Sequence, residues 1–215
     1  MKGHKWFAAI YDRMLALEER RFLGAVREEM LADLSGEVLE IGAGTGFNFP
    51  HYTSGAHVIA IEPDPFMLKR AQERAAGAAA HIELREAAAE DLPFPDASFD
   101  FVIDTLVMCT VHDPKKALSE IRRVLKPGGE YRFYEHVRYQ NPVAGFTQDV
   151  VTPAWRWLGA GCHPNRDTAT SISDAGFEIV QLERTKPFPP IPPMVWSRPR
   201  IRGVARHRTE GSRPS

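Results

Sequence analysis

The stretch Glu40-Ile41-Gly42-Ala43-Gly44-Thr45-Gly46 decides the fold of this chain of 215 residues. It continues an apolar run at residues 38–41 (VLEI), which predicts a short buried strand. Glycines at this position allow a tight turn and let backbone N–H groups approach a ligand without a Cβ in between. Glu62 closes the next predicted strand, 20 positions after Gly42, where an acid binds the hydroxyls of a ribose. Together these features predict a nucleoside site at the end of the first strand.

The glycine spacing and the preceding acid distinguish between two nucleoside cofactors. A dinucleotide fingerprint reads G-x-G-x-x-G and opens a helix that holds a pyrophosphate, whereas this sequence reads G-x-G-x-G and continues with Phe47. Glu40 lies two residues before the first glycine, and its negative charge would repel a pyrophosphate but suits a ligand with an ammonium and a sulfonium group. The pattern predicts S-adenosylmethionine rather than NAD. One alternative stays open, in which Glu40 is a strand-end acid that only bonds local backbone.

Strand and helix patterns alternate downstream of this stretch. Predicted strands cover residues 58–61, 81–86, 99–103, 131–136 and 177–182, and predicted helices cover residues 65–76, 114–125 and 168–175. The second helix begins with Asp113-Pro114, a cap and a first-turn proline, and ends before Lys126-Pro127-Gly128-Gly129, which predicts a turn. The alternation implies βαβ units, a mostly parallel doubly wound sheet, and ligands at the carboxyl ends of its strands.

The remaining segments predict a cover on this core. Apolar residues in the first 34 positions recur at helical spacing and predict one long or kinked amphipathic helix. The pattern weakens through residues 146–162, and six prolines between 187 and 199 predict an extended surface loop. We expect a single domain over residues 1–208. Its parts are an N-terminal helical cover (1–34), a cofactor-binding core (36–137) and acceptor-side elements with the last strands (138–208), followed by a flexible tail (209–215).

Composition excludes several other classes of protein. Hydrophobic residues make up 43 % and charged residues 26 %, which is typical of a soluble globular chain. The net charge of −1 excludes a strongly basic protein held to nucleic acid by charge alone, and no apolar run approaches the roughly 20 residues of a membrane span. The start of the chain does not read as a signal peptide, and two cysteines, Cys109 and Cys162, fit a reducing compartment. We expect a cytoplasmic protein.

A family resemblance rests on motifs spread over most of the chain. The motifs are FAAIYD (7–12), VLEIGAGTG (38–46), IEPDPFML (61–68), AEDLPFPDASFD (89–100) and DPKKALSEIRRVLKPGG (113–129). With these motifs the chain resembles the class I S-adenosylmethionine-dependent methyltransferases that carry a type-11 methyltransferase domain. Residues 105–109, 135–137, 153–155, 161–162 and 198–203 make it most similar to the small alkyl-thiol methyltransferases and their bacterial relatives. The resemblance implies an α/β, Rossmann-like, seven-stranded and mostly parallel sheet with helices on both faces, whose last strand, near residues 201–205, runs antiparallel.

The resemblance also assigns the residues that hold S-adenosyl-L-methionine. It places Gly42, Ala43, Gly44 and Gly46 at the methionine part with Glu40 beneath, Glu62 at the ribose, Pro63 beside the adenine, and Leu106 at the sulfur. Many relatives have an acid where this chain has Ala88, so Glu90 or Asp91 is the expected adenine partner. The alternatives are solvated loop acids for Glu90 and Asp91 and a plain core role for Leu106.

The acceptor side offers fewer fixed assignments. Methyl transfer is an in-line displacement, so the protein mainly positions a nucleophile, excludes water and in some cases removes a proton. His136 with Glu135 reads as a base with an orienting acid, and Tyr11 lies where related enzymes fold a helix over the cofactor. The alternatives are a strand-end histidine and a helix-core tyrosine, and Cys162-His163 makes a poor metal site, so we expect no metal.

Aromatic residues in the late segments favour a lipophilic, uncharged acceptor. They are Phe146, Trp155, Trp157, Phe188 and Trp196. We expect methyl transfer to a small hydrophobic molecule, with a thiol ahead of an amine, phenol or carbon because a thiol pKa of about 8.5 is easily lowered. Phospholipid or quinone-precursor methylation, with peripheral membrane contact, is the alternative. A non-catalytic or RNA-associated protein that uses six arginines between 198 and 213 is a third interpretation, although we expect no nucleic acid partner.

Overall fold

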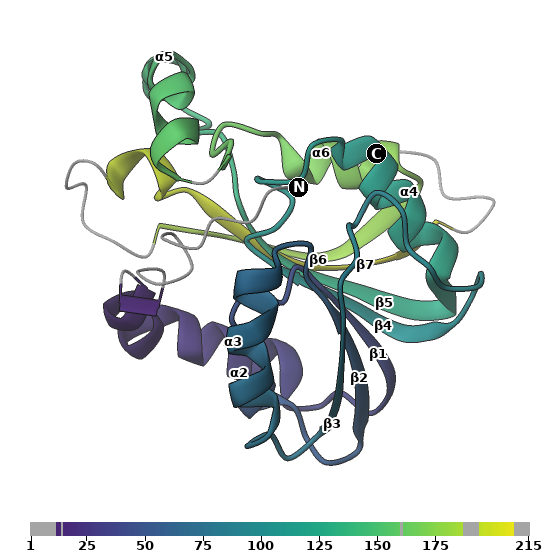
Figure 1. Cartoon of the computed structure of the whole chain (residues 1–215). Helices are drawn as coiled ribbons and strands as arrows, with labels where there is room; N and C mark the ends of the chain where they lie inside the picture. The colour runs from purple at the N-terminus through teal and green to yellow at the C-terminus, as the bar shows by residue number, and fades with distance from the viewer. Residues whose placement is uncertain (1–11, 14, 160, 187–193, 209–215) are drawn as a thin grey trace.

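The computed structural model describes residues 12, 13, 15–159, 161–186 and 194–208. Seven strands form one sheet in the order β3-β2-β1-β4-β5-β7-β6 (Figure 1). Their bounds are β1 Gly36–Ile41, β2 Ala56–Ile61, β3 His81–Arg85, β4 Phe99–Thr105, β5 Leu125–His136, β6 Phe177–Thr185 and β7 Arg200–His207. Neighbours from β3 to β5 pair parallel, and β7 pairs antiparallel with both β5 and β6. The predicted fold class, with its antiparallel last strand, is confirmed.

Helices cover both faces of the sheet and leave an apolar layer on each side. The helical elements are η1 Glu19–Leu23, α2 Gly24–Leu31, η2 Phe49–His51, α3 Pro65–Ala75, α4 Pro114–Val124, α5 Pro142–Leu158, α6 Thr168–Asp174 and η3 Met194–Ser197. Figure 1 shows α2 and α3 on one face and α4 and α6 on the other. The last four residues of β1 are all buried, as expected for a central parallel strand covered on both sides.

The helix starts follow their local sequence. Asp64 and Asp113 each precede a proline at the first helical position, and each side chain accepts backbone N–H bonds from the first turn. The N-terminal helix, which the sequence predicts as long or kinked, contains the π-helical turn η1, which continues directly into α2. No helix within the described part of the chain is long and apolar enough to cross a membrane.

Two segments differ from the sequence prediction. The helix α5 spans most of the stretch where the pattern weakens. The sequence does not predict it because its apolar residues Val143, Phe146 and Val150 face outward and Pro153 lies inside it, which hides the helical period. The strand β5 begins at Leu125, the predicted last residue of a helix, and includes residues 126–129, where the sequence predicts a turn. Its register against β4 shifts between Phe99 and Phe101. The 209–215 tail and most of the proline-rich loop lie outside the described residues.

Candidate functional site

The predicted glycine loop follows β1 and has the backbone geometry that only glycine adopts easily. Gly42, Gly44 and Gly46 have φ angles of 63°, 57° and 84°. A Cβ on Gly42 would lie 2.6 Å from Cγ2 of Val107, whereas a Cβ on Gly44 would meet nothing within 4 Å. The loop therefore packs tightly at its start and leaves open space at Gly44.

Glu62 lies where the sequence predicts it, directly after β2 and against this loop. Its Oε2 accepts the backbone N–H of Gly44 and its Oε1 accepts that of Asp64, both at 2.9 Å. Burial raises the pKa of Glu62 even though both backbone bonds lower it. Each oxygen keeps a lone pair beyond these bonds, so the carboxylate can accept two more hydroxyl donors.

Glu40 is buried at the end of β1 and is held by side chains rather than by local backbone. It accepts the amide N–H of Asn48 at 3.0 Å and the hydroxyl of Tyr52 at 2.8 Å. Burial raises its pKa to about 7, and Arg27 opposes that rise. Glu40 is therefore not the fixed negative charge that the sequence predicts, but a carboxyl group that a nearby cation would ionise.

A small cavity joins these residues. It is lined by Arg27, Glu40, Asn48, Thr105 and the loop residues 42–45. The guanidinium of Arg27 donates to the amide oxygen of Asn48 at 2.5 Å and so helps to orient the amide that holds Glu40. The sequence reasoning did not find Arg27, Asn48 or Tyr52, because they lie on segments without a motif.

The predicted adenine side is less clearly built. Glu90 uses Oε1 to accept the backbone N–H groups of His112 at 2.8 Å and Asp113 at 3.2 Å, so it holds the turn before α4. Asp91 is exposed, and Pro63 is half-buried beside Glu62. The role of Glu90 or Asp91 at the adenine stays a prediction.

The loop after β4 lies directly against the glycine loop. Leu106 has a φ of 63°, an unusual value for a residue with a side chain, and its N–H donates to the carbonyl of Tyr134 at 2.7 Å. Such strain persists only where the surroundings hold it and is common at active sites. Val107 then packs on Gly42, so the strained turn fixes the distance between the two loops.

Glu135 holds this loop in place. Its fully buried carboxylate accepts the backbone N–H groups of Val107, Met108 at 2.7 Å and Cys109 at 3.1 Å. Among the described hydrogen bonds none joins Glu135 to His136, so the predicted orienting acid binds the β4 loop instead. The three N–H groups are adjacent and belong to no helix or strand, so they need an acceptor from elsewhere, and the carboxylate of Glu135 on β5 supplies it. Glu135 is therefore a positioning residue.

A second buried carboxyl group shares this environment. Burial and the neighbouring Asp104 raise the pKa of Glu135 well above its ordinary value. Burial likewise raises the pKa of Asp104 to about 7, although it is hydrogen-bonded to Tyr131 and to Glu135. One proton shared between the two carboxyl groups removes the repulsion that two buried charges would have.

His136 lies between two thiols that come from distant segments. Its Nδ1 is 3.6 Å from Sγ of Cys109, after β4, and 3.5 Å from Sγ of Cys162, after α5. A hydrogen bond from Cys109 and the nearby His136 lower the pKa of Cys162 to about 4, while burial and the bond to Cys162 raise that of Cys109. The imidazole of His163 contacts the carbonyl of Cys109 through Nδ1 at 3.3 Å rather than a thiol, and its backbone N–H donates to the same carbonyl at 2.6 Å. The sequence places neither Cys109 nor His136 beside Cys162, because the three residues come from separate segments.

Other predicted acceptor-side residues have mixed positions. Trp157 is 85 % exposed and Phe146 is 66 % exposed on α5, so they do not line the cavity described here. Trp155 and Trp196 are half-buried, whereas Tyr11 and Phe188 lie outside the described residues.

Three of the six arginines near the end of the chain pair with acidic side chains. Arg200 is buried and pairs with Glu18, Arg202 pairs with Glu29 and Glu183, and Arg206 pairs with Glu130. These pairs favour a structural role over an anionic partner. The strand that carries them, β7, lies inside the sheet between β5 and β6.

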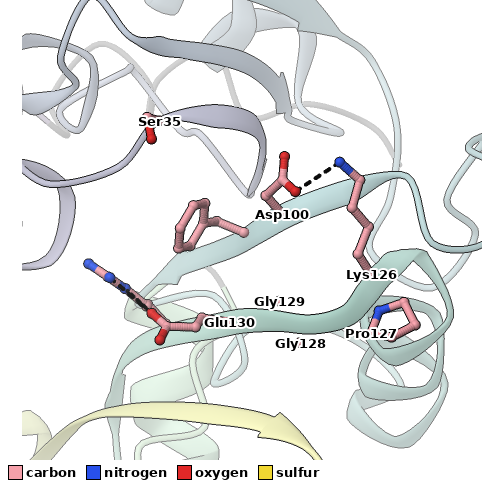
Figure 2. Close-up of a pocket in the computed structure, with 9 residues that line it drawn as sticks. Ser35, Asp100, Lys126, Pro127, Gly128, Gly129 and Glu130 are labelled. Atoms are coloured by element: carbon pink, nitrogen blue, oxygen red, sulfur yellow. Dashed lines mark hydrogen bonds and ion pairs between the residues drawn. The ribbon is translucent and has the colours of Figure 1, made fainter.

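A larger hollow lies away from the candidate site. Figure 2 shows it between the beginning of β4 and the first half of β5, with Asp100 and Lys126 facing each other at 2.8 Å. Its volume is about 490 Å³. It borders the amino end of β4, whereas the glycine loop follows the carboxyl end of β1, so we do not assign the cofactor to it.

Comparison with known proteins gives a consistent result. The family described as "Methyltransferase domain" matches residues 39–133. The chain is 40 % identical over 191 residues to the thiol S-methyltransferase TMT1B of Rattus norvegicus, covering 84 % of this chain and 75 % of that protein. It is 34 % identical over 212 residues to the thiol S-methyltransferase TMT1A of Homo sapiens, covering 93 % and 82 %.

Solved structures support the same fold. A putative methyltransferase from Bacillus halodurans superimposes with a TM-score of 0.70 at 18 % identity, over 87 % of this chain and 99 % of that one. At this identity the likeness concerns the fold alone.

Proposed function

The chain belongs to the methyltransferase family that contains these thiol S-methyltransferases, and we propose that it methylates the sulfur of a small hydrophobic thiol. It is an S-adenosylmethionine-dependent methyltransferase. The observation that carries the thiol acceptor is the similarity at 34–40 % identity, which extends over most of the chain. These relatives do not favour phospholipid or quinone-precursor methylation.

The residues around the glycine loop fit S-adenosylmethionine. Open space at Gly44 leaves room for the methionine part, and the spare lone pairs of Glu62 suit two ribose hydroxyls. Glu40 lies in the same small cavity and would stabilise an ammonium group while the ammonium favours its ionised form. The bound cofactor supplies a methyl group on a positively charged sulfur, which is a good leaving group.

The chain's own contribution is to position the acceptor and exclude water. Glu135 fixes residues 107–109 against Gly42, so the loop that faces the reacting groups cannot drift away from the cofactor. His136, at the carboxyl end of β5, is the side chain that we propose on the acceptor side. We retain Tyr11 as a proposal from the sequence.

A panel of acceptors tests the proposal. The purified chain is incubated with S-adenosylmethionine carrying a labelled methyl group and with alkyl thiols, aryl thiols, amines, phenols or phosphatidylethanolamine vesicles. We expect labelled thioether from alkyl thiols, in equal amount to the demethylated cofactor, and at least ten times faster than any other product. Faster transfer to the lipid, phenol or amine would refute the thiol acceptor. A Glu62→Ala variant is the control for cofactor-dependent transfer.

A further inference from the structure

Three buried side chains with metal-binding atoms meet beside the glycine loop. They are Cys109 after β4, His136 at the end of β5 and Cys162 after α5, and their ligand atoms all lie within 4.8 Å of one another. The three residues are 1 %, 9 % and 6 % exposed. Nothing in the proposed methyl transfer explains why two thiols surround one imidazole nitrogen.

The two sulfur–nitrogen distances match those of a tetrahedral zinc site. With Zn–S bonds of about 2.3 Å and Zn–N bonds of about 2.0–2.1 Å, a tetrahedral ion separates a sulfur from a nitrogen ligand by roughly 3.6 Å. The observed separations from Nδ1 of His136 are 3.6 Å to Cys109 and 3.5 Å to Cys162. Nδ1 of His136 has a single lone pair and accepts one S–H group, and Sγ of Cys109 also lies 3.6 Å from the carbonyl oxygen of Leu106.

Rigid neighbours hold two of the three ligands, Cys109 and His136. Cys109 donates its N–H to Glu135 and accepts the N–H of His163 on its carbonyl, which fixes it from both sides. His136 is paired with Arg200 in the register between β5 and β7. Preorganised ligands of this kind are what a metal site requires, since a loose cluster loses its affinity to chain entropy.

We propose that Cys109, His136 and Cys162 bind one zinc ion and leave its fourth position open for the sulfur of the acceptor thiol. Three protein ligands with one open position are the pattern of catalytic zinc. Among the described residues, no further cysteine, histidine or carboxylate belongs to this cluster. Two thiolates also balance the charge of Zn²⁺, so a buried ion would remain neutral until a third thiolate binds. The acceptor half of this inference rests on the proposed function.

The proposed step balances as follows. The thiol R–SH binds zinc through sulfur and gives its proton to water, because a thiol coordinated to zinc is deprotonated. A sulfur lone pair then forms a bond to the methyl carbon of the cofactor. The bond between that carbon and the sulfonium sulfur breaks, and its electron pair stays on the cofactor, which becomes a neutral thioether. The methylated product is also a neutral thioether and leaves zinc more readily than a thiolate. Val107, two residues before Cys109, contacts the glycine loop, so the cluster borders the cofactor site.

Metal content tests the site without relying on activity. The full chain, without a histidine tag, is incubated with zinc sulfate, desalted and measured by mass spectrometry for elemental zinc. We expect one zinc per chain, and a loss of most of it in Cys109→Ser, His136→Ala and Cys162→Ser. His163→Ala is the matched control, since it adjoins Cys162 but lies outside the cluster, and it retains zinc. Absence of stoichiometric zinc from the wild-type chain would overturn the site.

Cobalt reports the open position even if a ligand variant fails to fold. Cobalt in the wild-type site absorbs in the near ultraviolet with the intensity of two thiolates, and we expect an alkyl thiol to raise that intensity by about half. Cobalt binding that does not respond to the thiol would overturn the acceptor position.

Activity then separates the two proposals. We expect a chelator to reduce thiol methylation at least tenfold and added zinc to restore it. Full thiol methylation by the metal-free chain would overturn the zinc step while the proposed function stands. Zinc binding without methylation of any thiol would contradict the proposed function and leave the metal site standing.

Discussion

Glu62 is the residue whose removal most directly tests the cofactor site. Its carboxylate accepts two backbone N–H groups, one of them from Gly44 in the glycine loop, and keeps two acceptor positions for a ribose. Glu62→Ala removes both acceptor positions and also releases the N–H of Gly44. We expect weaker binding of S-adenosylmethionine to a chain that still folds.

The size of the loss follows from these bonds. A hydrogen bond to a charged group contributes about 1.5–3 kcal/mol. In the variant the ribose hydroxyls bond to water instead, which offsets part of this loss. We therefore take the net loss of one such bond, about 1.4 kcal/mol, as the minimum effect, which is a tenfold loss of affinity. Two bonds set the upper end, near a hundredfold loss.

Calorimetric titration of S-adenosylmethionine into the two chains measures the difference, and circular dichroism confirms that the variant is folded. Glu83→Ala is a matched control, because Glu83 is a surface carboxylate on the neighbouring strand β3 that pairs with Arg85. We expect the control to bind like the wild type. An unchanged affinity in a folded Glu62→Ala chain would refute the assignment of the ribose to Glu62.

Three further predictions concern the loops and the buried acids. Gly42→Ala places a Cβ 2.6 Å from Cγ2 of Val107 and should destabilise the chain measurably in thermal denaturation. The new Cβ of Gly44→Ala meets no atom within 4 Å, so this variant should lose only about 1 kcal/mol of stability. It should nevertheless weaken cofactor binding at least tenfold. Glu135→Gln leaves at least one N–H of the β4 loop without an acceptor, so we expect a loss of about 1–3 kcal/mol in urea denaturation and a lower kcat for the thiol. Glu40 has an ordinary pKa of 4.5 that burial raises to about 7. Its stabilising contribution is therefore full below pH 4.5 and lost as the pH rises through about 7, by about 3 kcal/mol. Urea denaturation against pH should show a decline across this range that is smaller in Glu40→Gln than in the wild type by about 3 kcal/mol, because Asp104 and Glu135 also have raised pKa values in both chains.

The parts of the fold that local sequence specifies were predicted well. The apolar runs of β1 and β2 and the Asp-Pro starts of α3 and α4 each depend on a few adjacent residues. The helix α5 was missed because its outward apolar side chains and internal Pro153 conceal the helical period. The early start of β5 depends on pairing between Leu125 and Phe99, a contact that no short window contains.

The candidate site shows the same division between near and distant residues. The glycine loop and Glu62 follow from spacing along the chain, because the turn and the strand end are local features. The cysteine–histidine cluster joins residues 26 and 27 positions apart, from three separate segments. Glu135 reaches the β4 loop over a similar separation, so its positioning role appears only once β4 and β5 are paired.

The position of β7 has a consequence for how the chain is completed during synthesis. This strand comes last in the sequence but lies between β5 and β6, so β6 has no partner in the sheet until residues 200–207 have left the ribosome. Arg200 also carries the buried ion pair to Glu18, near the beginning of the described chain. A nascent chain that stops before β7 would therefore expose the edge of β5, leave β6 unpaired and lack the anchor of its N-terminal helix. We expect such chains to depend on chaperones until the final strand inserts.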